Sequence, residues 1–248
     1  MISIAALIYR SPAYADALHG ALHRHTPHLA DGRAEFFFVA NDPTDALVAH
    51  LQLRGYRFFE NRNAVLSAEE LRARGFAGPE YIRRVYQGWN VAIGRARGDK
   101  IVLINSDMMV APHWLDALEL GAADDTVISS QIVERHHERH GVNPLAIHGE
   151  FGRHPGEFDE AGFIERIRPL GPGKAGLARG GVYMPTMFRR EHLDAVGLFP
   201  EGNLLTPTGR VRYGDEDLFA RLAAYGVRHE TALGSMAYHF KEGEMDER

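Results

Sequence analysis

Short, almost wholly apolar runs recur along the first half of this chain, and each is followed by a segment with apolar residues at helical spacing. The clearest runs are residues 2–8 (ISIAALI), 35–40 (EFFFVA) and 100–105 (KIVLIN). Such runs, without alternating polar residues, are typical of strands that are buried on both faces. Strands that alternate with helices predict an α/β fold, with a mostly parallel central sheet and helices on both faces.

The helical segments are predicted from apolar residues that recur every three or four positions. The strongest is residues 81–97, in which Ile82, Val85 and Trp89 share one face. Gly98 suits the end of this helix. Further helices are expected over residues 14–25, 44–54, 191–196 and 215–225 and from residue 112 onward, and further strands over 56–60, 127–133 and up to 238–240.

The chain of 248 residues shows neither an internal repeat nor a linker, so we expect a single domain over residues 1–248. Residues 1–133 carry the strand–helix alternation and are expected to bind the donor nucleotide, whereas residues 134–248 form a second, acceptor-binding half. Residues 134–178 are rich in glycine, proline and charged residues, which predicts long loops with short strands. Long structured loops in a compact domain are usually functional.

Five histidines lie in this loop-rich segment at irregular spacing, namely His136, His137, His140, His148 and His154. Structural zinc sites commonly combine histidine with cysteine, and this chain has no cysteine. A zinc site is therefore disfavoured, and a mobile acceptor-binding loop is the preferred interpretation. The absence of cysteine also excludes disulfides and thiolate nucleophiles, and it fits a reducing cytoplasm.

The charge of the chain argues against a nucleic-acid partner. It has 28 Lys and Arg against 33 Asp and Glu, and it has no basic stripe that could neutralise phosphates. No stretch approaches the ~18 apolar residues of a membrane span. We therefore expect a cytoplasmic protein without a transmembrane segment, with peripheral attachment to the inner membrane face as the alternative.

Polar residues that directly follow the strands matter most, because parallel sheets bind ligands beyond the carboxyl ends of their strands. Asp107 follows the strongest strand, in the sequence IVLINSDMMV. Mg²⁺ and Mn²⁺ prefer oxygen ligands and commonly bind one or two protein carboxylates together with substrate phosphates. Asp107 could therefore join a metal to a diphosphate; the alternative is an aspartate that caps the turn into the next helix.

Three consecutive acids, Asp215, Glu216 and Asp217, stand at the expected start of a helix. Acids at this position complement the helix dipole, which is a sufficient structural reason for them. Asp217 and Arg221 are four residues apart and are expected to form an intrahelical ion pair. This leaves Asp215 as the first candidate for a catalytic base and Glu216 as the second.

His239 lies at the end of the last expected strand, and Lys241 comes two residues later. Imidazole can bind a metal and lysine can contact a phosphate, although a lone histidine is more often structural. The chain contains no GxSxG nucleophile elbow. Neither GxGxxG nor GxxxxGK[ST] follows a strand, so dinucleotide binding of the Rossmann kind is disfavoured.

Five segments carry a family resemblance by their order along the chain. They are WNVAIGRARGDKIVL, LINSDMMVAPHWLDAL, MFRREHLDAVGLFPEGN, YGDEDLFARLAAYG and the late YHF. Together they resemble inverting GT-A glycosyltransferases of family 2, in which a strand with a DxD-like end precedes Pro-x-Trp-Leu. Asn105 stands where a full DxD has its first acid, so a single carboxylate, Asp107, would serve the metal.

The resemblance implies roles for individual residues. Asp107 is implied to bind a metal and the diphosphate, with His239 as a further metal ligand or phosphate contact. Asp215 is implied to be the catalytic base, with Glu216 as the alternative. The remaining implied contacts are Ser106 beside the ribose, Tyr9, Asn41 and Asp42 around the nucleotide base, and Arg83 on the base or the phosphates.

The resemblance also implies a reaction. A sugar, expected to be a hexose, would pass from a nucleoside-diphosphate sugar, UDP by default, to an acceptor hydroxyl with inversion, assisted by Mn²⁺ or Mg²⁺. The acceptor would be a glycan, a lipid-linked molecule or a small molecule. The alternatives are a nucleotidyltransferase acting on sugar phosphates, whose usual Gly-rich basic loop is missing from YRSPAYADAL, and a non-catalytic nucleotide- or sugar-binding protein.

Overall fold

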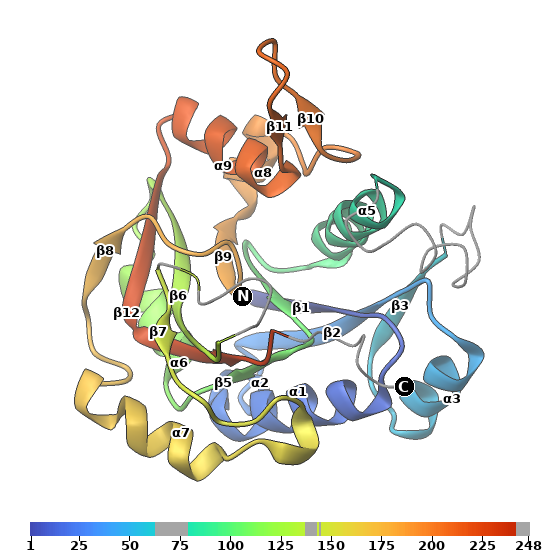
Figure 1. Ribbon diagram of the computed structural model, residues 1–248, viewed down its shortest axis with the longest axis vertical. Helices are drawn as coiled ribbons and strands as arrows, with labels where there is room; N and C mark the ends of the chain where they lie inside the picture. The colour runs from blue at the N-terminus through green and yellow to red at the C-terminus, as the bar shows by residue number, and fades with distance from the viewer. Residues whose placement is uncertain (63–78, 137–142, 144, 242–248) are drawn as a thin grey trace.

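The structure, a computed structural model, describes residues 1–62, 79–136, 143 and 145–241 (Figure 1). Ten strands of the described chain form one sheet: β1 (Ile2–Ile8), β2 (Ala34–Asn41), β3 (Phe58–Asn61), β4 (Lys100–Asn105), β5 (Met108–Val110), β6 (Thr126–Glu134), β7 (Ile147–His148), β8 (Leu177–Arg179), β9 (Thr186–Arg189) and β12 (Arg228–His239). Two further strands, β10 (Leu204–Leu205) and β11 (Val211–Arg212), pair as a separate hairpin.

Helices cover both faces of the sheet, as the sequence predicts (Figure 1). One face carries α1 (Pro12–His25), α2 (Pro27–Ala30), α3 (Asp45–Leu53), α6 (Trp114–Gly121) and α7 (Glu160–Ile167). The other face carries α5 (Pro79–Arg95), α8 (Arg190–Val196) and α9 (Gly214–Ala224). Among the described helices, none has the length and apolar character needed to span a membrane.

The sheet is mostly parallel, which confirms the predicted fold class. Its main order is β3-β2-β1-β4-β9-β6-β12-β5. Strands β3, β2, β1 and β4 are parallel neighbours, and β12 is parallel to β6. The exceptions are β9, antiparallel to both β4 and β6, and β5 and β8, antiparallel to β12. Strands from both halves of the chain thus complete one sheet.

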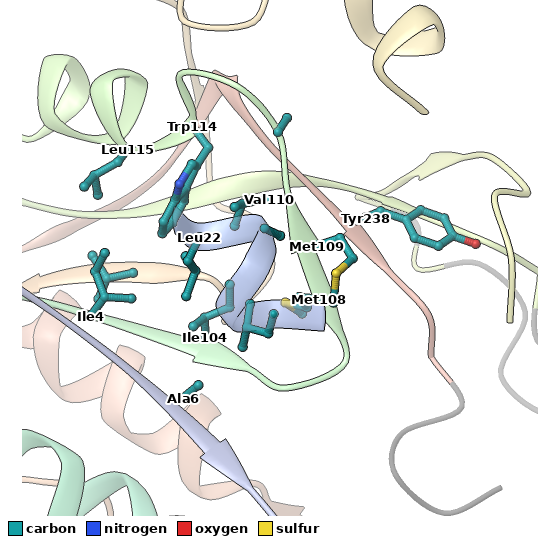
Figure 2. Packing of buried hydrophobic residues seen from close by; sticks show 14 of the residues in the cluster. Ile4, Ala6, Leu22, Ile104, Met108, Met109, Val110, Trp114, Leu115 and Tyr238 are labelled. Atoms are coloured by element: carbon teal, nitrogen blue, oxygen red, sulfur yellow. The ribbon is translucent and has the colours of Figure 1, made fainter. Parts of the chain in front are cut away.

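Successive residues of the central strands enter different hydrophobic cores. Ile4 of β1 belongs to the same core as Leu22 of α1 and Trp114 of α6 (Figure 2). The next residue, Ala5, belongs to the second core together with Trp89 of α5. Burial on both faces therefore explains why the strands read as continuous apolar runs.

A buried carboxylate ties the amino ends of β1 and β2 to the loop after α5. Glu35 accepts hydrogen bonds from Ser3 Oγ at 2.6 Å and Arg97 Nε at 2.7 Å, and it also pairs with Arg57. Burial alone would raise the pKa of Glu35, but the hydrogen bonds from Arg97, Ser3 and Arg57 lower it to about 2. At the adjoining Gly98 a Cβ would lie 2.4 Å from a backbone carbonyl oxygen, so only glycine fits this close approach.

The segment 134–178 contains more regular structure than the sequence predicts. In addition to β7 and the start of β8, it holds α7 and two short 3₁₀ turns, Pro155–Glu157 and Arg168–Leu170. Helix α7 buries Phe163 and Ile167 in the core on the α1 side of the sheet. Part of the segment interpreted as long loops therefore serves the core.

The histidines of this segment do not gather into one cluster within the described residues. His136 (through its backbone N–H), His148 and His154 each contact a nearby glutamate. His137 and His140 lie outside the described residues. In the part of the chain that the structure describes, no group of three or more His, Asp or Glu side chains is placed to hold a metal ion.

Candidate functional site

A cavity of about 380 Å³ opens where β1, β2 and β4 end. Helix α5 lines one side of it, and the start of α9 contributes to another. The edge is the one at which a parallel sheet binds ligands, and the volume lies in the range of small-molecule sites. The lining side chains that carry a polar group are Tyr9, Asn41, Arg84, Tyr86, Trp89, Asn105, Ser106, Asp107, Tyr213 and Asp215.

Asp107 and His239 meet because β12 runs beside the turn that follows β4. Strand β5 pairs antiparallel with β12, so that Met108 lies opposite His239. The N–H of Phe240 donates a hydrogen bond to the carbonyl of Asp107 at 3.0 Å. The Nε2 atom of His239 lies 3.2 Å from Oδ2 of Asp107. The end of the last strand therefore brings a histidine to the carboxylate at the cavity wall.

A second carboxylate, Glu134, contacts the other ring nitrogen of His239. The parallel pairing of β6 with β12 places Glu134 opposite His239, and Oε2 lies 3.1 Å from Nδ1. Lys241 Nζ lies 2.6 Å from the other oxygen, Oε1. Asp107, His239, Glu134 and Lys241 thus form a row of alternating charge at the carboxyl edge of the sheet.

The charges in this row shift the ionisation of its members. Burial alone would lower the pKa of His239, but Asp107 and Glu134 outweigh burial and raise it to about 9. Burial alone would raise the pKa of Glu134, but hydrogen bonds from His239 and Lys241 lower it to about 2. Glu134 is therefore a carboxylate, and His239 carries a positive charge when its partners are the two acids.

Asp107 and His239 would offer an oxygen and a nitrogen ligand to a divalent cation, provided that Nε2 of His239 gives up its proton when the ion binds. The two atoms concerned, Oδ2 of Asp107 and Nε2 of His239, lie 3.2 Å apart. A metal-binding histidine usually gives its other ring N–H to a carboxylate, and Glu134 is in that position. These residues fit a cation held jointly with the phosphates of a ligand.

Glu134 was missed by the sequence analysis, which named Asp107 and His239. A signal was present in the sequence, because Glu134 is a carboxylate at the carboxyl end of a buried strand, β6. Asp107 was named for the same reason, since it closely follows the end of β4. What the sequence could not supply was the order of strands in the sheet, which brings β6 and β12 together.

The three acids at the start of α9 have different surroundings. Asp215 lines the cavity. Glu216 instead pairs with Arg210 at 3.0 Å. Asp217 forms the expected ion pair with Arg221, at 2.8 Å. Burial, with a smaller contribution from Glu216, raises the pKa of Asp215 above the ordinary value of an aspartate.

The position of Asp215 is set by contacts between α5 and the start of α9. The Tyr86 hydroxyl accepts a hydrogen bond from the N–H of Gly214 at 2.8 Å. A Cβ on Gly214 would lie 2.4 Å from the Tyr86 ring, so the two elements touch where only glycine fits. The Tyr86 ring also stacks on Phe199, whose N–H and C=O both bond to the Asn90 amide. The FPEG segment and the acidic helix are thus fixed to α5.

The end of the cavity at β2 is built from amides and a buried ion pair. Asn41 donates to the carbonyl of Arg84 at 3.2 Å and accepts from Asn61 at 2.8 Å. Arg84 pairs with Asp42 at 3.1 Å, and both side chains are less than a tenth exposed. Arg84 lines the cavity, whereas Asp42 is not in its lining and stands behind it as the partner of Arg84.

The structure brings together most, but not all, of the residues named from the sequence. Those in the cavity lining are Tyr9, Asn41, Ser106, Asp107 and Asp215, and His239 adjoins Asp107.

Arg83, by contrast, is half exposed and pairs with Glu201 at 3.4 Å. Its neighbour Arg84 faces the cavity instead. The difference is one of helical phase, since adjacent residues of a helix point in directions about 100° apart. Arg84, Tyr86 and Trp89 are lining residues that the sequence analysis did not assign to a site.

Comparison with known proteins gives a fold and no closer relationship. No protein-family model and no curated protein matches the sequence. Among solved structures, GalNAc-T7 with UDP, GalNAc and Mn²⁺ matches with a TM-score of 0.59 at 12% identity, over 96% of this chain and 43% of that one.

Two further structures match in the same way. TarS 1–349 of S. aureus has a TM-score of 0.58 at 14% identity, over 96% of this chain and 60% of that one. The mannosyltransferase PcManGT of Pyrobaculum calidifontis, in complex with GDP-Man and Mn²⁺, has a TM-score of 0.57 at 13% identity, over 96% of this chain and 56% of that one. This chain therefore spans about half the length of these neighbours, and it shares with them an α/β fold of the GT-A kind.

Proposed function

We propose that this protein is a glycosyltransferase that moves a sugar, a hexose by default, from a nucleoside-diphosphate sugar to an acceptor hydroxyl. The observation that carries the proposal is that one cavity is lined both by Asp107, which is paired with His239, and by Asp215. Asp107 and His239 suit a diphosphate leaving group and its cation, and the carboxylate of Asp215 suits a general base. A single displacement by an acceptor hydroxyl would use both chemistries.

The donor would lie across the carboxyl ends of β2, β1 and β4. Its diphosphate would lie at Asp107 and His239, with Ser106 beside the ribose. The nucleotide base would extend toward Tyr9, Asn41 and Arg84, which line the cavity near β1, β2 and α5. The buried Asp42 would act through its ion pair with Arg84 rather than by direct contact. UDP is the default donor nucleotide.

The acceptor hydroxyl would approach Asp215. Burial raises the pKa of Asp215, which makes its carboxylate a stronger base than an exposed aspartate. As the hydroxyl loses its proton to Asp215, its oxygen attacks the anomeric carbon on the face opposite the nucleoside diphosphate. The C–O bond to the diphosphate breaks with its electron pair, and the product has inverted configuration.

The leaving diphosphate gains negative charge in this step. Mn²⁺ or Mg²⁺, when bound, would supply positive charge that offsets it. Of the chain's own groups, Lys241 and, when no ion is bound, the protonated His239 lie beside Asp107 and Glu134, and Glu134 keeps the imidazole oriented toward Asp107.

The neighbours in structure support the donor class. Two of them were solved with a nucleotide or nucleotide sugar and Mn²⁺, namely UDP in one and GDP-Man in the other. The two nucleotides differ, so the shared fold favours a nucleoside diphosphate without choosing its base. A cytoplasmic location belongs to the same proposal.

The first test is calorimetric titration of the purified protein with UDP, GDP and dTDP, each with and without Mn²⁺. Binding of one nucleotide that strengthens at least about tenfold with Mn²⁺ is the expected result. Folded protein that binds none of the three would overturn the proposal. Nucleotide binding without release of sugar to any acceptor or to water would favour a non-catalytic binding protein.

A further inference from the structure

An apolar strip leads outward from the cavity along the hairpin of β10 and β11. Tyr213 lines the cavity and is 57% exposed, and Val211 and Leu205 are 48% and 76% exposed. These three residues are called the hairpin strip below. Contiguous exposed apolar side chains beside a cavity are unusual on a soluble protein unless they meet a ligand or partner.

The three side chains of the hairpin strip share one face. Leu205 and Val211 are cross-strand partners in the antiparallel hairpin, and such partners project on the same side. Tyr213 follows Val211 by two residues and has an extended backbone, with φ −68° and ψ 151°. Because side chains alternate along an extended chain, Tyr213 continues the face that starts at Leu205.

The opposite face of the hairpin is turned toward α9. Arg210 pairs with Glu216 at 3.0 Å, and Arg212 pairs with Asp217 at 3.5 Å. These arginines alternate with Val211 along the chain, so their contacts with α9 place the hairpin strip on the side away from those acids. The strip is therefore a neutral surface, although charged residues flank it in the sequence.

The hairpin projects from the α8–α9 side of the molecule (Figure 1). Two-stranded hairpins are marginally stable alone, and this one is held to the body by the arginine pairs on its other face. The strip does not contribute to either of the two hydrophobic cores of the described chain. Its apolar side chains are thus available to a ligand without any rearrangement of the cores.

The strip begins beside the candidate base. Tyr213 and Asp215 are two residues apart, and both line the cavity. If Asp215 marks the reacting hydroxyl, the rest of an acceptor would leave the cavity past Tyr213 and meet Val211 and Leu205. Phe199, Ile82 and Val85 add apolar side chains to the lining of the same cavity.

We propose that the hairpin strip binds an apolar aglycone, a hydrocarbon chain attached to the acceptor whose hydroxyl reacts at Asp215. The proposal rests on the proposed glycosyltransferase function and names the class of its acceptor. A neutral strip continuous with the cavity suits a hydrocarbon chain, because burial of methylene groups needs no charged or hydrogen-bonding partner. A polar glycan alone would leave Leu205 and Val211 without a complementary surface.

The test compares binding of methyl, butyl, hexyl and octyl β-D-glucosides, each below its micelle concentration, to the wild-type protein and to a Leu205→Ser/Val211→Ser variant. Fully buried methylene groups each improve affinity about fourfold, so about twofold per methylene is expected on a half-open strip. The double variant is expected to lose this dependence on chain length. Both side chains are exposed in the folded protein, so the substitutions should leave its fold intact.

The matched control is Leu204→Ser, because Leu204 is 40% exposed and pairs with Arg212 on the other face of the same hairpin. It should keep the wild-type dependence on chain length. A wild-type protein without that dependence, or a double variant that retains it, would overturn the proposal. Vesicle binding or self-association that the double variant loses, without any chain-length dependence, would also overturn it in favour of a membrane or a second copy.

Nucleotide binding measured on the same samples separates this proposal from the function on which it rests. Wild-type protein that binds UDP, GDP or dTDP but shows no chain-length dependence contradicts only the role of the strip. Protein that binds none of these nucleotides contradicts the proposed function itself. The double variant is expected to bind the nucleotide as tightly as wild type.

Discussion

The hydroxyl of Tyr86 accepts a hydrogen bond from the N–H of Gly214 at 2.8 Å, and this contact joins α5 to the first turn of α9. Asp215 is the next residue along the chain and lines the cavity. Helix α5, which lines the part of the cavity proposed for the nucleotide, thus also sets the position of the candidate base. Substitutions of Tyr86 and Asp215 therefore test the two elements that this contact joins.

Tyr86→Phe should lower turnover by about 5- to 10-fold, the effect of losing one hydrogen bond that orients Asp215. The ring and its stacking on Phe199 remain, so KM for the donor should stay within about twofold. Steady-state kinetics, with an acceptor or with water as acceptor, measure both quantities. Tyr225→Phe is the control, because Tyr225 is exposed at the far end of α9. An increase in KM alone would show that Tyr86 serves donor binding instead.

Asp215→Asn should lower turnover at least ~100-fold, the usual contribution of a general base, while nucleotide binding is retained. The pKa of Asp215 is raised by burial, so wild-type activity should fall, as pH decreases, at a higher pH than the ordinary pKa of an aspartate would give. The Asn variant should lose that dependence on pH. Glu216→Gln is the matched control, since Glu216 pairs with Arg210 outside the cavity lining. Greater damage from Glu216→Gln would assign the base to Glu216.

Asp107→Ala should abolish turnover and remove most of the gain in nucleotide affinity that Mn²⁺ gives. His239→Ala should reduce that gain by a smaller factor, because Asp107 and the phosphates would still hold the cation. Removal of divalent ions with a chelator should affect wild type as Asp107→Ala does. Calorimetry with and without Mn²⁺ checks each point, with the exposed Asp45→Asn as the charge-matched control. Normal activity of Asp107→Ala would remove that residue from the site.

Glu35→Gln should lower the free energy of unfolding at neutral pH by about 2 to 3 kcal/mol, because Arg57 and Arg97 lose a buried partner. The pKa of Glu35 is about 2 in the folded protein, against an ordinary value of 4.5. Its stabilisation is therefore complete above the ordinary value and is lost as pH falls toward 2. Urea unfolding at a series of pH values should show the two proteins converging in acid. A gap that stays constant down to pH 3 would contradict this account.

The sequence supported the fold and the strand-end residues because both depend on local patterns. The apolar run of β4 and the helical spacing of α5 are visible within about 20 residues, and they predict where Asp107 and Asn41 lie. The partners of these residues depend on which strands become neighbours. The insertion of the antiparallel β9 between β4 and β6, and the pairing of β5 with β12, have no local signal.

Two differences show the limits of spacing arguments. Arg83 and Arg84 are adjacent, and only the actual rotation of α5 over the sheet decides that Arg84 faces the cavity. Helix α7 is only 8 residues long, and the two core residues in it, Phe163 and Ile167, give too few repeats to reveal a helical period. The roles of Asp107, Asp215 and His239 in catalysis stay predictions until the variants above are measured.

Strand β12 lies between β6 and β5, two strands that are separated in the sequence by little more than α6. On a ribosome, every other strand of the sheet is synthesised before the one that must enter between these two. Nascent chains shorter than about residue 228 would therefore hold an incomplete sheet, with Asp107 present and His239 absent. Contacts between residues so distant in sequence form late and slowly. The contact between Asp107 and His239 would thus form only after β12 has been synthesised and has entered the sheet between β6 and β5.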